Sequence, residues 1–323
     1  MHDASIPLRE SDVKILSIIV EYGPISLTEL SSLTGYTKSW VWKKVKRLES
    51  LGLVSLDKRS GTLYINQNQA TYKGTLRIGI LRASEYPYII PFSRLLKDIT
   101  HSVTVAVYDE AYKLASDLAS GRVHLAFAPA VTLIAMHRLS GGRVHIIGGG
   151  SRGGTGIVYS RQGGYGHATT MASTMELCAT VSRLKPPRVY KRSGNEILES
   201  VFTGEVEAGV VWEPYLYIAR NKGLDVEACR LPFCCLLGAN SLLEDDYRRI
   251  SSIFARSLDI VSARGVDLQA YAELIGMDYG LVEATVSSYE YIREIPVNDL
   301  KMLSRHIVDT IMPPNMILDS VYI

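Results

Sequence analysis

The sequence predicts a multidomain α/β protein, with an N-terminal winged helix-turn-helix followed by a two-lobed α/β domain that ends in helices. Three observations predict this class. The chain has 323 residues, more than one ordinary domain needs. A basic helix, a turn and a charged hairpin occupy residues 37–61. From residue 75 onward, short apolar strands alternate with helices in two successive units, which is typical of mostly parallel α/β sheets.

Composition places the chain among globular proteins and excludes several classes. Hydrophobic residues make up 47% and charged residues 21% of the sequence. The first ten residues, MHDASIPLRE, lack the basic start and apolar core of a secretory signal. No uninterrupted apolar run approaches the ~18 residues that a membrane span requires. We therefore expect a cytoplasmic protein without membrane contact, and the low count of four glutamines hints at a thermophilic source.

The chemistry-bearing residues predict no catalytic or metal site. The four cysteines, at 178, 229, 234 and 235, fit neither paired zinc ligands nor a regular disulfide framework. We expect them to be reduced, buried thiols. The seven histidines are scattered, and none has a second ligand at metal-binding spacing. Neither a GxSxG elbow nor an HExxH sequence is present, so we expect no catalytic residues, no metal and no cofactor.

The first three predicted helices follow from capping residues and apolar spacing. Ser11 can cap the first helix, and Gly23-Pro24 ends it. Ser26 and Glu29 have the spacing of a capping box, which predicts the start of the second helix. Gly35 ends that helix, and Thr37 opens the third.

The third helix carries the predicted DNA-binding residues. Val41, Val45 and Leu48 recur at helical spacing and should pack inward. Seven basic and two acidic residues give residues 37–61 a charge of +5, which indicates a docking surface on a nearly neutral chain. Short residues at the helix start would reach base edges, and basic residues would neutralise phosphates. The predicted DNA-binding residues are Thr37, Lys38, Ser39, Trp40, Lys43, Lys44, Arg47, Lys58 and Arg59.

The hairpin completes this domain, for which we set the boundaries 1–66. Strands are expected at 53–56 and 62–65, with a charged tip at 57–61. The order of helices and hairpin resembles winged-helix regulators of the MarR, ArsR and IclR kind. The resemblance implies double-stranded DNA as a partner; a winged helix that contacts proteins instead is the alternative. Trp40 and Trp42 cannot both face inward with Val41, so we expect at least one to be exposed or in a second interface.

The sequence predicts a linker at residues 67–74 and places the second domain at 75–323. The expected strands are 75–81, 103–107, one within 121–129, 144–147, 157–160, 188–190 and one that ends near Trp212. The expected helices lie near 89–96, 112–118, 171–183, 197–203, 243–263, 268–275, 279–288 and 297–310. Residues 312–323, which contain two prolines, could dock on another chain.

A glycine-rich run at 148–156 contains the spacing GxGxxG but no dinucleotide fingerprint. A fingerprint needs a helix directly afterwards, and Ile157 to Ser160 instead read as a strand. We expect a loop whose amides, together with Arg152, could hold an anion.

The second domain resembles solute-binding proteins for nitrate, sulfonate and taurine, and the related thiamine-pyrimidine synthases. The string GEVEAGVVWEPY at 204–215 carries the resemblance, with Glu207 where that family usually has Asp. The string GRVHLA at 121–126 echoes it in the first lobe, with His124 in place of the usual acid. The resemblance implies two lobes, about 75–156 plus 236–323 and about 157–235, with ligand held between them.

Ligand-binding residues are expected in loops at strand ends, the usual binding place in open α/β sheets. Arg152 and loop amides would suit a carboxylate, phosphate or sulfonate, and Tyr86 and Trp212 would suit a flat ring. Trp212 could equally be core, and Glu213 could cap the following helix. The predicted ligand-binding residues are Ser84, Glu85, Tyr86, Pro129, Ala130, Ser151, Arg152, Trp212 and Glu213.

Together these patterns favour a non-enzymatic, ligand-responsive transcription regulator that senses a small anionic or aromatic metabolite. A homodimer is expected because helix-turn-helix proteins usually read paired half-sites. Two alternatives remain. One is a small-molecule binder whose winged helix contacts proteins. The other is a fold-related enzyme of thiamine-pyrimidine or menaquinone biosynthesis.

Overall fold

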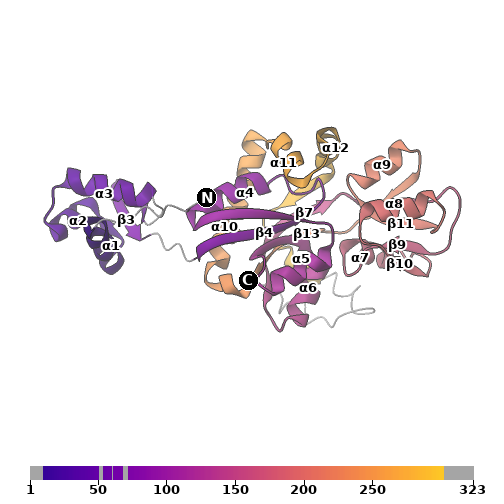
Figure 1. Ribbon diagram of the computed structural model, residues 1–323, viewed down its shortest axis with the longest axis horizontal. Helices are drawn as coiled ribbons and strands as arrows, with labels where there is room; N and C mark the ends of the chain where they lie inside the picture. Colours follow the sequence, from indigo (N-terminus) through magenta and orange to yellow (C-terminus); the bar gives the residue numbers. More distant parts are fainter. Residues whose placement is uncertain (1–9, 51–53, 60, 68–71, 302–323) are drawn as a thin grey trace. The chain divides into compact units, whose positions relative to one another are not determined.

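A computed structural model describes residues 10–50, 54–59, 61–67 and 72–301 (Figure 1). Its contacts divide the chain into two compact units. The first comprises Met1–Thr75 with Lys97–Ser102, and the second comprises Leu76–Leu96 with Val103–Ile323. Each unit is described by itself.

The first unit contains three helices and a three-stranded sheet. The helices are α1 (Glu10–Tyr22), α2 (Leu27–Thr34) and α3 (Lys38–Ser50). The predicted capping box begins α2: the Ser26 hydroxyl accepts the Glu29 N–H at 3.2 Å, and the Glu29 carboxylate accepts the Ser26 N–H at 2.8 Å. Gly35, with φ +74°, ends α2 in the left-handed conformation that glycine adopts without strain.

The hairpin of this unit is longer than the sequence predicts. Strands β2 (Val54–Arg59) and β3 (Thr62–Gln67) pair antiparallel, and β1 (Ile25–Ser26) pairs with the other edge of β3. The pairing runs to Arg59 opposite Thr62, so residues expected in the charged tip belong to β2. The reason is that hydrogen bonds between the strands join backbone groups, so the pairing continues through polar residues as readily as through apolar ones.

The core of the first unit forms where the three helices meet β3. Its fully buried members come from α1, α2, α3 and β3, including the predicted inward residues of α3: Ile15, Ile19, Leu30, Val41, Val45, Leu48 and Ile65. The predicted winged helix-turn-helix fold is therefore present.

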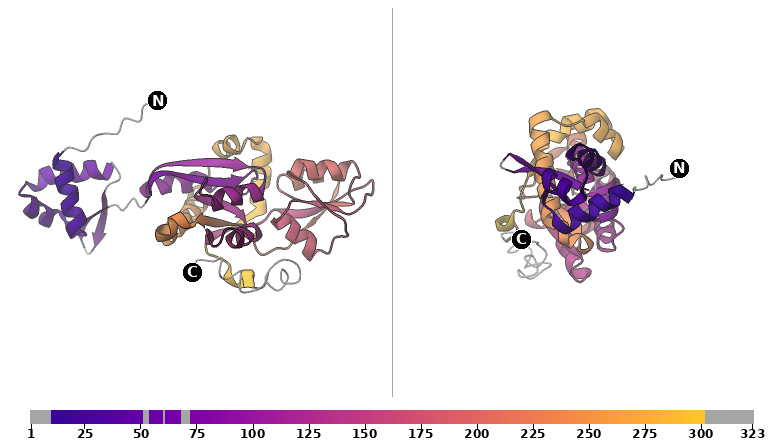
Figure 2. Two further views of the ribbon diagram at one scale, coloured as in Figure 1. Left: turned by 60° about the horizontal axis from the view of Figure 1, so that its bottom comes forward. Right: turned by 90° about the vertical axis from the view of Figure 1, so that its left-hand side faces the viewer.

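The second unit contains two sheets with helices on their faces (Figure 2). The first sheet has the strand order β14-β7-β13-β6-β4-β5. These strands are β4 (Tyr72–Leu81), β5 (Thr100–Tyr108), β6 (Leu125–Pro129), β7 (Val144–Gly153), β13 (Cys235–Asn240) and β14 (Tyr289–Ile292). The first residues of β4, up to Thr75, and of β5, up to Ser102, fall in the first unit. Helices α5 (Ala111–Ala119) and α6 (Ala130–Leu139) cover one face, and α4 (Ile89–Leu95) and α10 (Tyr247–Arg264) pack near the other.

The second sheet has the order β10-β9-β11-β8-β12 and forms the second lobe. Its strands are β8 (Thr155–Tyr159), β9 (His167–Thr169), β10 (Arg188–Tyr190), β11 (Ala208–Trp212) and β12 (Asp225–Ala228). Helices α8 (Gly194–Phe202) and α9 (Tyr215–Asn221) bury one face, and α7 (Thr174–Val181) buries the other. Val210 and Val211 are both fully buried because the two faces of β11 are each covered.

The sheets are less parallel than predicted. Pairs β4–β6, β9–β10 and β9–β11 are parallel, but β13 runs antiparallel to β6 and β7, and β8 runs antiparallel to β11 and β12. These two strands directly follow the points where the chain passes from one lobe to the other, after Gly153 and after Ala228. A strand that enters a sheet from the opposite lobe has no crossover helix to bring it back parallel.

The glycine-rich run is a strand and not the predicted loop. Residues Gly148 to Gly153 continue β7 between β13 and β14. A Cβ on Gly149 would lie 2.0 Å from the Ile292 carbonyl oxygen, and one on Gly150 would lie 2.0 Å from that of Cys235. The glycines therefore allow close backbone approach within a sheet and do not build an anion-binding loop.

The C-terminal part is helical, as expected, with additions. Helices α11 (Leu268–Ile275) and α12 (Tyr279–Thr285) follow α10, and the chain is helical again at 297–301. The rest of the expected helix at 297–310 and the segment 312–323 lie outside the described residues. Short strands β9, β12 and β14 and helix α6 have no counterpart in the prediction.

The prediction that all four cysteines are reduced is wrong for two of them. Cys178 on α7 and Cys229 after β12 form a disulfide, with their Cα atoms 6.1 Å apart across 51 residues of sequence. Cys234 and Cys235 are free and buried. Pairing of the first two depends on α7 folding back beside the connection that leaves β12, which spacing along the chain does not reveal.

Candidate functional site

The exposed face of α3 presents part of the predicted DNA-binding set. Lys38, Ser39 and Lys43 are exposed, and Thr37 precedes the helix with its carbonyl accepting the Val41 N–H at 3.0 Å. Lys46, which the sequence reading left out, is exposed as well and pairs with Glu49. This face combines short polar residues at the helix start with basic residues further along, the arrangement that a major-groove helix uses.

Two predicted cations face the domain interior instead. The Lys44 ammonium lies 2.8 Å from the carboxylate of Asp12, which is fully buried, and donates to the Ser11 hydroxyl at 2.8 Å. The Arg47 guanidinium lies 3.6 Å from the same carboxylate. Since a buried carboxylate requires charged partners, Lys44 stabilises the junction of α1 and α3 and is only 14% exposed.

Both tryptophans of α3 are half-buried and pack against the core of their own unit. Trp40 stacks near Tyr36, with ring centroids 4.1 Å apart, and Lys44 lies over its ring. Trp42 lies beneath the Lys46 ammonium. Neither is therefore fully exposed, because lysine side chains and a neighbouring ring cover the faces that the helix leaves open.

The hairpin places Lys58 in an exposed position on β2. Arg59 pairs with Thr62 through its backbone, and its side chain lies outside the described residues.

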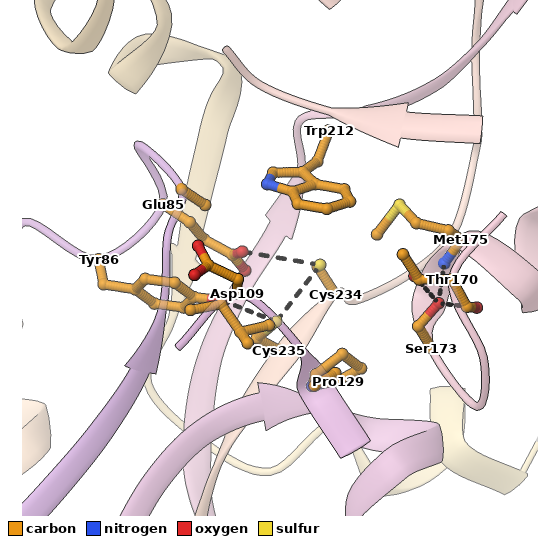
Figure 3. Close-up of a pocket in the computed structure, with 13 residues that line it drawn as sticks. Glu85, Tyr86, Asp109, Pro129, Thr170, Ser173, Met175, Trp212, Cys234 and Cys235 are labelled. Carbon is orange, nitrogen blue, oxygen red and sulfur yellow. Dashed lines mark hydrogen bonds between the residues drawn. The ribbon is translucent and has the colours of Figure 1, made fainter. Parts of the chain in front are cut away.

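Within the second unit, a cavity lies between the two lobes (Figure 3). The loops that follow β4, β5 and β6 form one wall, and those after β9 and β11 form the other. These are carboxyl ends of strands, where open α/β sheets bind ligands. Its lining residues are Leu81, Ala83, Glu85, Tyr86, Asp109, Ala111, Pro129, Thr170, Ser173, Met175, Trp212, Cys234 and Cys235.

A buried carboxyl group lies in the wall of the cavity. Glu85 is 2% exposed, accepts the Ser151 hydroxyl through Oε1, and lies with Oε2 3.8 Å from Cys234 Sγ. Burial raises the pKa of Glu85 above its ordinary value, against the opposing effect of the hydrogen bond from Ser151. No lysine or arginine is among the lining residues in the described part of the chain.

Two aromatic residues contribute to the cavity from opposite lobes. The indole N–H of Trp212 donates to the Arg82 carbonyl at 3.3 Å, so the polar atom of the ring is engaged with protein. Tyr86 donates its hydroxyl proton to Cys235 Sγ at 3.0 Å, and its N–H donates to the Tyr271 hydroxyl at 2.9 Å. The apolar surfaces that remain suit a flat, uncharged ring.

The other predicted cleft residues lie behind or away from the cavity. Ser84 accepts the Thr285 hydroxyl at 2.8 Å, and Ala130 begins α6. Glu213 is 1% exposed; it accepts the Tyr217 N–H at 2.9 Å and pairs with Arg220 at 2.8 Å, which holds the start of α9. Arg152 pairs with Glu290 on β14, is 43% exposed and does not line the cavity.

A second hollow adjoins the first and shares Ala111 and Thr170 with it. Its lining includes two basic residues, Lys191 and Arg192, together with Glu110, Tyr112, Met171 and Tyr190. Lys191 pairs with Glu205 at 2.9 Å. The basic residues of this hollow therefore come from the segment between β10 and α8, and Arg152 is not among them.

The sequence reading missed the cavity residues of the second lobe and the cysteine pair. Thr170 and Ser173 lie between β9 and α7, and Met175 lies in the first turn of α7. The three-residue strand β9 was too short to show as a pattern in the sequence. The hydroxyl of Ser173 caps α7 by accepting the Met175 N–H at 3.1 Å. A Ser three residues before an acidic residue could have signalled this helix start.

Comparison with known proteins agrees with both folds. Residues 8–55 match the protein-family model described as winged helix-turn-helix DNA-binding. No protein of curated function matches the chain by sequence. The chain thus joins a winged helix-turn-helix to a two-lobed fold, and the solved structures identify the second part.

The two-lobed fold is that of solute-binding proteins. The alkanesulfonate-binding protein SsuA from Xanthomonas axonopodis pv. citri, bound to MOPS, aligns with TM-score 0.61 and 14% identity, covering 77% of this chain and 98% of that one. The periplasmic nitrate-binding protein NrtA from Synechocystis PCC 6803 aligns with TM-score 0.60 and 11% identity, covering 77% and 86%. A ligand-binding component of an ABC-type import system from Staphylococcus aureus, with zinc bound, aligns with TM-score 0.61 and 15% identity. The alignment covers 77% of this chain and 97% of that one.

These findings define a DNA-binding domain fused to a solute-binding-protein-like fold. Among the described residues, no helix combines the length and the apolar character that crossing a bilayer would require.

Proposed function

We propose that this protein is a transcription regulator that binds duplex DNA through its winged helix and responds to a small molecule bound between its two lobes. The observation that carries the proposal is the union, in one chain, of a matched DNA-binding domain and a two-lobed fold with an interlobe cavity. A regulator of this kind needs no catalytic step.

On this proposal the DNA-binding residues are those exposed on α3 and β2. Lys38, Ser39, Lys43 and Lys58, with Thr37 before the helix, make contacts to bases and phosphates. Trp40, Lys44 and Arg47 act indirectly. Lys44 and Arg47 hold α3 against α1 through Asp12, and Trp40 packs beneath the Lys44 ammonium. Arg59, the residue after Lys58, stays in the proposed set for its charge alone.

The effector is an aromatic or otherwise flat molecule with a small polar group. The lining of Trp212, Tyr86 and Met175 favours an apolar body, and the Glu85 carboxyl favours a hydrogen-bond donor or a cation. An anionic substituent would extend into the adjoining hollow, towards Lys191 and Arg192, since the inner cavity offers no positive side chain.

The regulator acts as a homodimer in the cytoplasm. A dimer would bind two half-sites one helical turn apart, the common arrangement for helix-turn-helix proteins. A structural disulfide in a cytoplasmic protein is unusual except in hyperthermophiles. The Cys178–Cys229 disulfide and the scarcity of glutamine both fit a thermophilic source.

Equilibrium DNA binding and native mass spectrometry test the proposal together. The full-length chain should bind duplex DNA from upstream of its own coding sequence, with affinity falling steeply as salt rises. Protein purified without added ligand should release an unmodified small molecule on denaturation, and that molecule should change the DNA affinity. Affinity for the duplex that does not depend on salt, with a protein captured through the first unit, would overturn it.

A further inference from the structure

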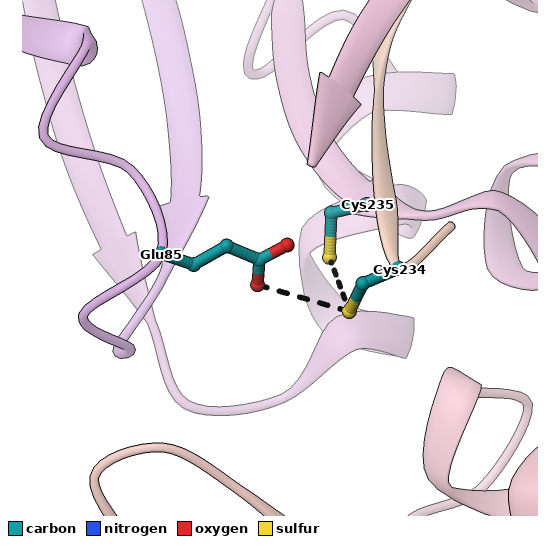
Figure 4. Close-up of side chains that lie close together, drawn as sticks. All are labelled: Glu85, Cys234 and Cys235. Carbon is teal, nitrogen blue, oxygen red and sulfur yellow. Dashed lines mark hydrogen bonds between the residues drawn. The ribbon is translucent and has the colours of Figure 1, made fainter. Parts of the chain in front are cut away.

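Three metal-binding side chains meet in the wall of the interlobe cavity. Glu85 follows β4, and Cys234 and Cys235 stand at the beginning of β13, 149 residues further along the chain. Their ligand atoms all lie within 4.8 Å of one another, and all three residues are buried (Figure 4). Within the described ranges, this is the one His/Cys/Asp/Glu cluster with that geometry.

We propose that Glu85, Cys234 and Cys235 bind a thiophilic metal cation, of the class of Zn²⁺, Cd²⁺ or Cu⁺, inside the interlobe cavity. The distances suit such an ion. Cys234 Sγ lies 3.5 Å from Cys235 Sγ and 3.8 Å from Glu85 Oε2. Around a tetrahedral Zn²⁺, with Zn–S of about 2.3 Å and Zn–O of about 2.1 Å, those separations would be about 3.8 and about 3.6 Å.

The backbone brings both thiols to the same side, which a regular strand would not do. Successive side chains of a strand point to opposite faces. Here β13 begins at Cys235, and Cys234 still belongs to the segment that crosses between the lobes. Both side chains consequently line the cavity. A pair of cysteines that merely filled an apolar core would not need this arrangement.

Neighbouring hydroxyl groups hold the ligands in the orientation that a cation needs. Ser151 donates to Glu85 Oε1, which leaves Oε2 directed at the thiols. Tyr86 donates to Cys235 Sγ at 3.0 Å. Hydrogen bonds of this kind orient metal ligands. The described lining residues include no lysine or arginine, so no basic side chain of the lining occupies the space between these ligand atoms.

The second lobe reaches the same site. Thr174 Oγ1, at the beginning of α7, lies 3.7 Å from Cys234 Sγ. The side chain of Met175 enters the cavity from that lobe, and its thioether is a soft ligand (Figure 3). An ion held by Glu85 and the two thiols that also took the Met175 thioether as a ligand would link the two lobes and stabilise their arrangement. This regulatory consequence rests on the proposed function; metal binding itself does not.

Cadmium titration of the full-length chain tests the site. The protein is stripped with a chelator, kept under a non-thiol reductant and titrated with Cd²⁺. We expect an ultraviolet sulfur-to-metal charge-transfer band that saturates at one Cd²⁺ per chain. The matched control is C178S/C229S, which removes the other two cysteines and should keep both the band and the stoichiometry. Absence of the band from the wild type, or from this control, overturns the proposal.

Two further variants separate the ligands from the fold. C234S/C235S should lose the band and bind Cd²⁺ at least 100-fold more weakly. Glu85→Gln retains both thiols, so it should keep the band but bind about 10–100-fold more weakly, an effect of the size that altered metal surroundings produce. A band that persists in C234S/C235S, or an unchanged Cd²⁺ affinity in Glu85→Gln, contradicts the site. The second variant decides the question if the first does not fold.

DNA binding distinguishes failure of the site from failure of the proposed function. Duplex affinity is measured with stripped and Cd²⁺-loaded protein, and a several-fold difference that Glu85→Gln reduces supports metal-dependent regulation. If Cd²⁺ binds while DNA affinity stays the same, the metal site stands and its regulatory role is wrong. If no duplex binds under either condition, the proposed function fails and the titration still decides the metal site.

Discussion

At the scale of single residues, buried ionisable groups decide how this protein responds to pH. His124 is 1% exposed, and its Nδ1 accepts the Arg77 N–H at 3.0 Å. Burial, and then the Arg77 guanidinium beside the ring, lower the pKa of His124 to about 4. A proton on Nδ1 would displace the donor and place a charge next to another charge.

His124 should make the second unit less stable in mild acid. Its folded-state pKa lies below the unfolded value of about 6.5. The stability that neutral, buried His124 contributes to the second unit is therefore fully present above pH 6.5 and is lost as pH falls towards 4. The loss amounts to roughly 3 kcal/mol at most, from 1.36 kcal/mol per unit of pKa. Urea unfolding of wild type and His124→Asn between pH 7.5 and 4 should give a flatter profile for the variant; parallel profiles would refute this origin.

Neighbouring lysines on α3 should behave in opposite ways when replaced by alanine. Lys44→Ala removes a partner from the buried Asp12 carboxylate and should lower unfolding free energy by about 2–4 kcal/mol, with Arg47 left as partial compensation. Lys43→Ala removes an exposed side chain and should change stability by no more than about 0.5 kcal/mol. Thermal unfolding of the two variants provides the comparison, and equal losses would contradict the assigned roles.

At the scale of elements, α3 divides its basic residues between structure and binding. If Lys43 contacts a phosphate, Lys43→Ala should weaken duplex binding at all sequences alike and reduce the slope of log affinity against log salt by about one. Anisotropy titrations at several salt concentrations measure that slope. The control is Lys14→Ala on α1, an exposed lysine outside the proposed surface. An unaltered slope for Lys43→Ala would remove it from the interface.

Strand β7 should tolerate a methyl group at one glycine and reject it at another. A Cβ at Gly150 would meet the Cys235 carbonyl oxygen at 2.0 Å, and the backbone of β13 cannot move aside without opening the sheet. At Gly148 the nearest atom is Leu237 Cδ2 at 3.2 Å, the end of a flexible side chain. Gly150→Ala should therefore cost at least ~3 kcal/mol, and Gly148→Ala about 1 kcal/mol. Chemical unfolding separates the two, and similar midpoints would argue against the tight strand pairing.

At the scale of the whole molecule, the proposed function requires a two-way coupling. If a cleft ligand changes DNA affinity by some factor, DNA must change the affinity for that ligand by the same factor. With the ligand recovered from purified protein, DNA affinity is measured with and without ligand, and ligand affinity is measured with and without DNA. The two factors should be equal. Trp212 provides an optical signal for its binding, and Trp212→Phe should abolish the fluorescence change that binding causes. A signal unaffected by Trp212→Phe would place the ligand elsewhere.

The sequence by itself determined features that depend on local pattern. Alternating strands and helices predicted an α/β fold, the strings at 121–126 and 204–215 implied its two lobes by resemblance, and the capping box at Ser26 and Glu29 predicted the start of α2. The inward residues Val41, Val45 and Leu48 followed from helical spacing alone. Periodicity and capping depend on residues close together in the chain, so they can be predicted from the amino-acid sequence alone.

Only the tertiary structure decided which distant residues meet. Lys44 pairs with Asp12 across 32 residues, and Glu85 meets Cys234 across 149, although nothing in the local sequence marks either pair. The glycine-rich run became a central strand because β13 and β14 approach it too closely for any side chain. Arg152 left the predicted site because Glu290 lies opposite it on β14. Burial, charge pairing and close backbone approach arise between elements that are distant in the sequence. They explain why Lys43 on α3 faces outward, whereas Lys44 stabilises the junction of α3 with α1.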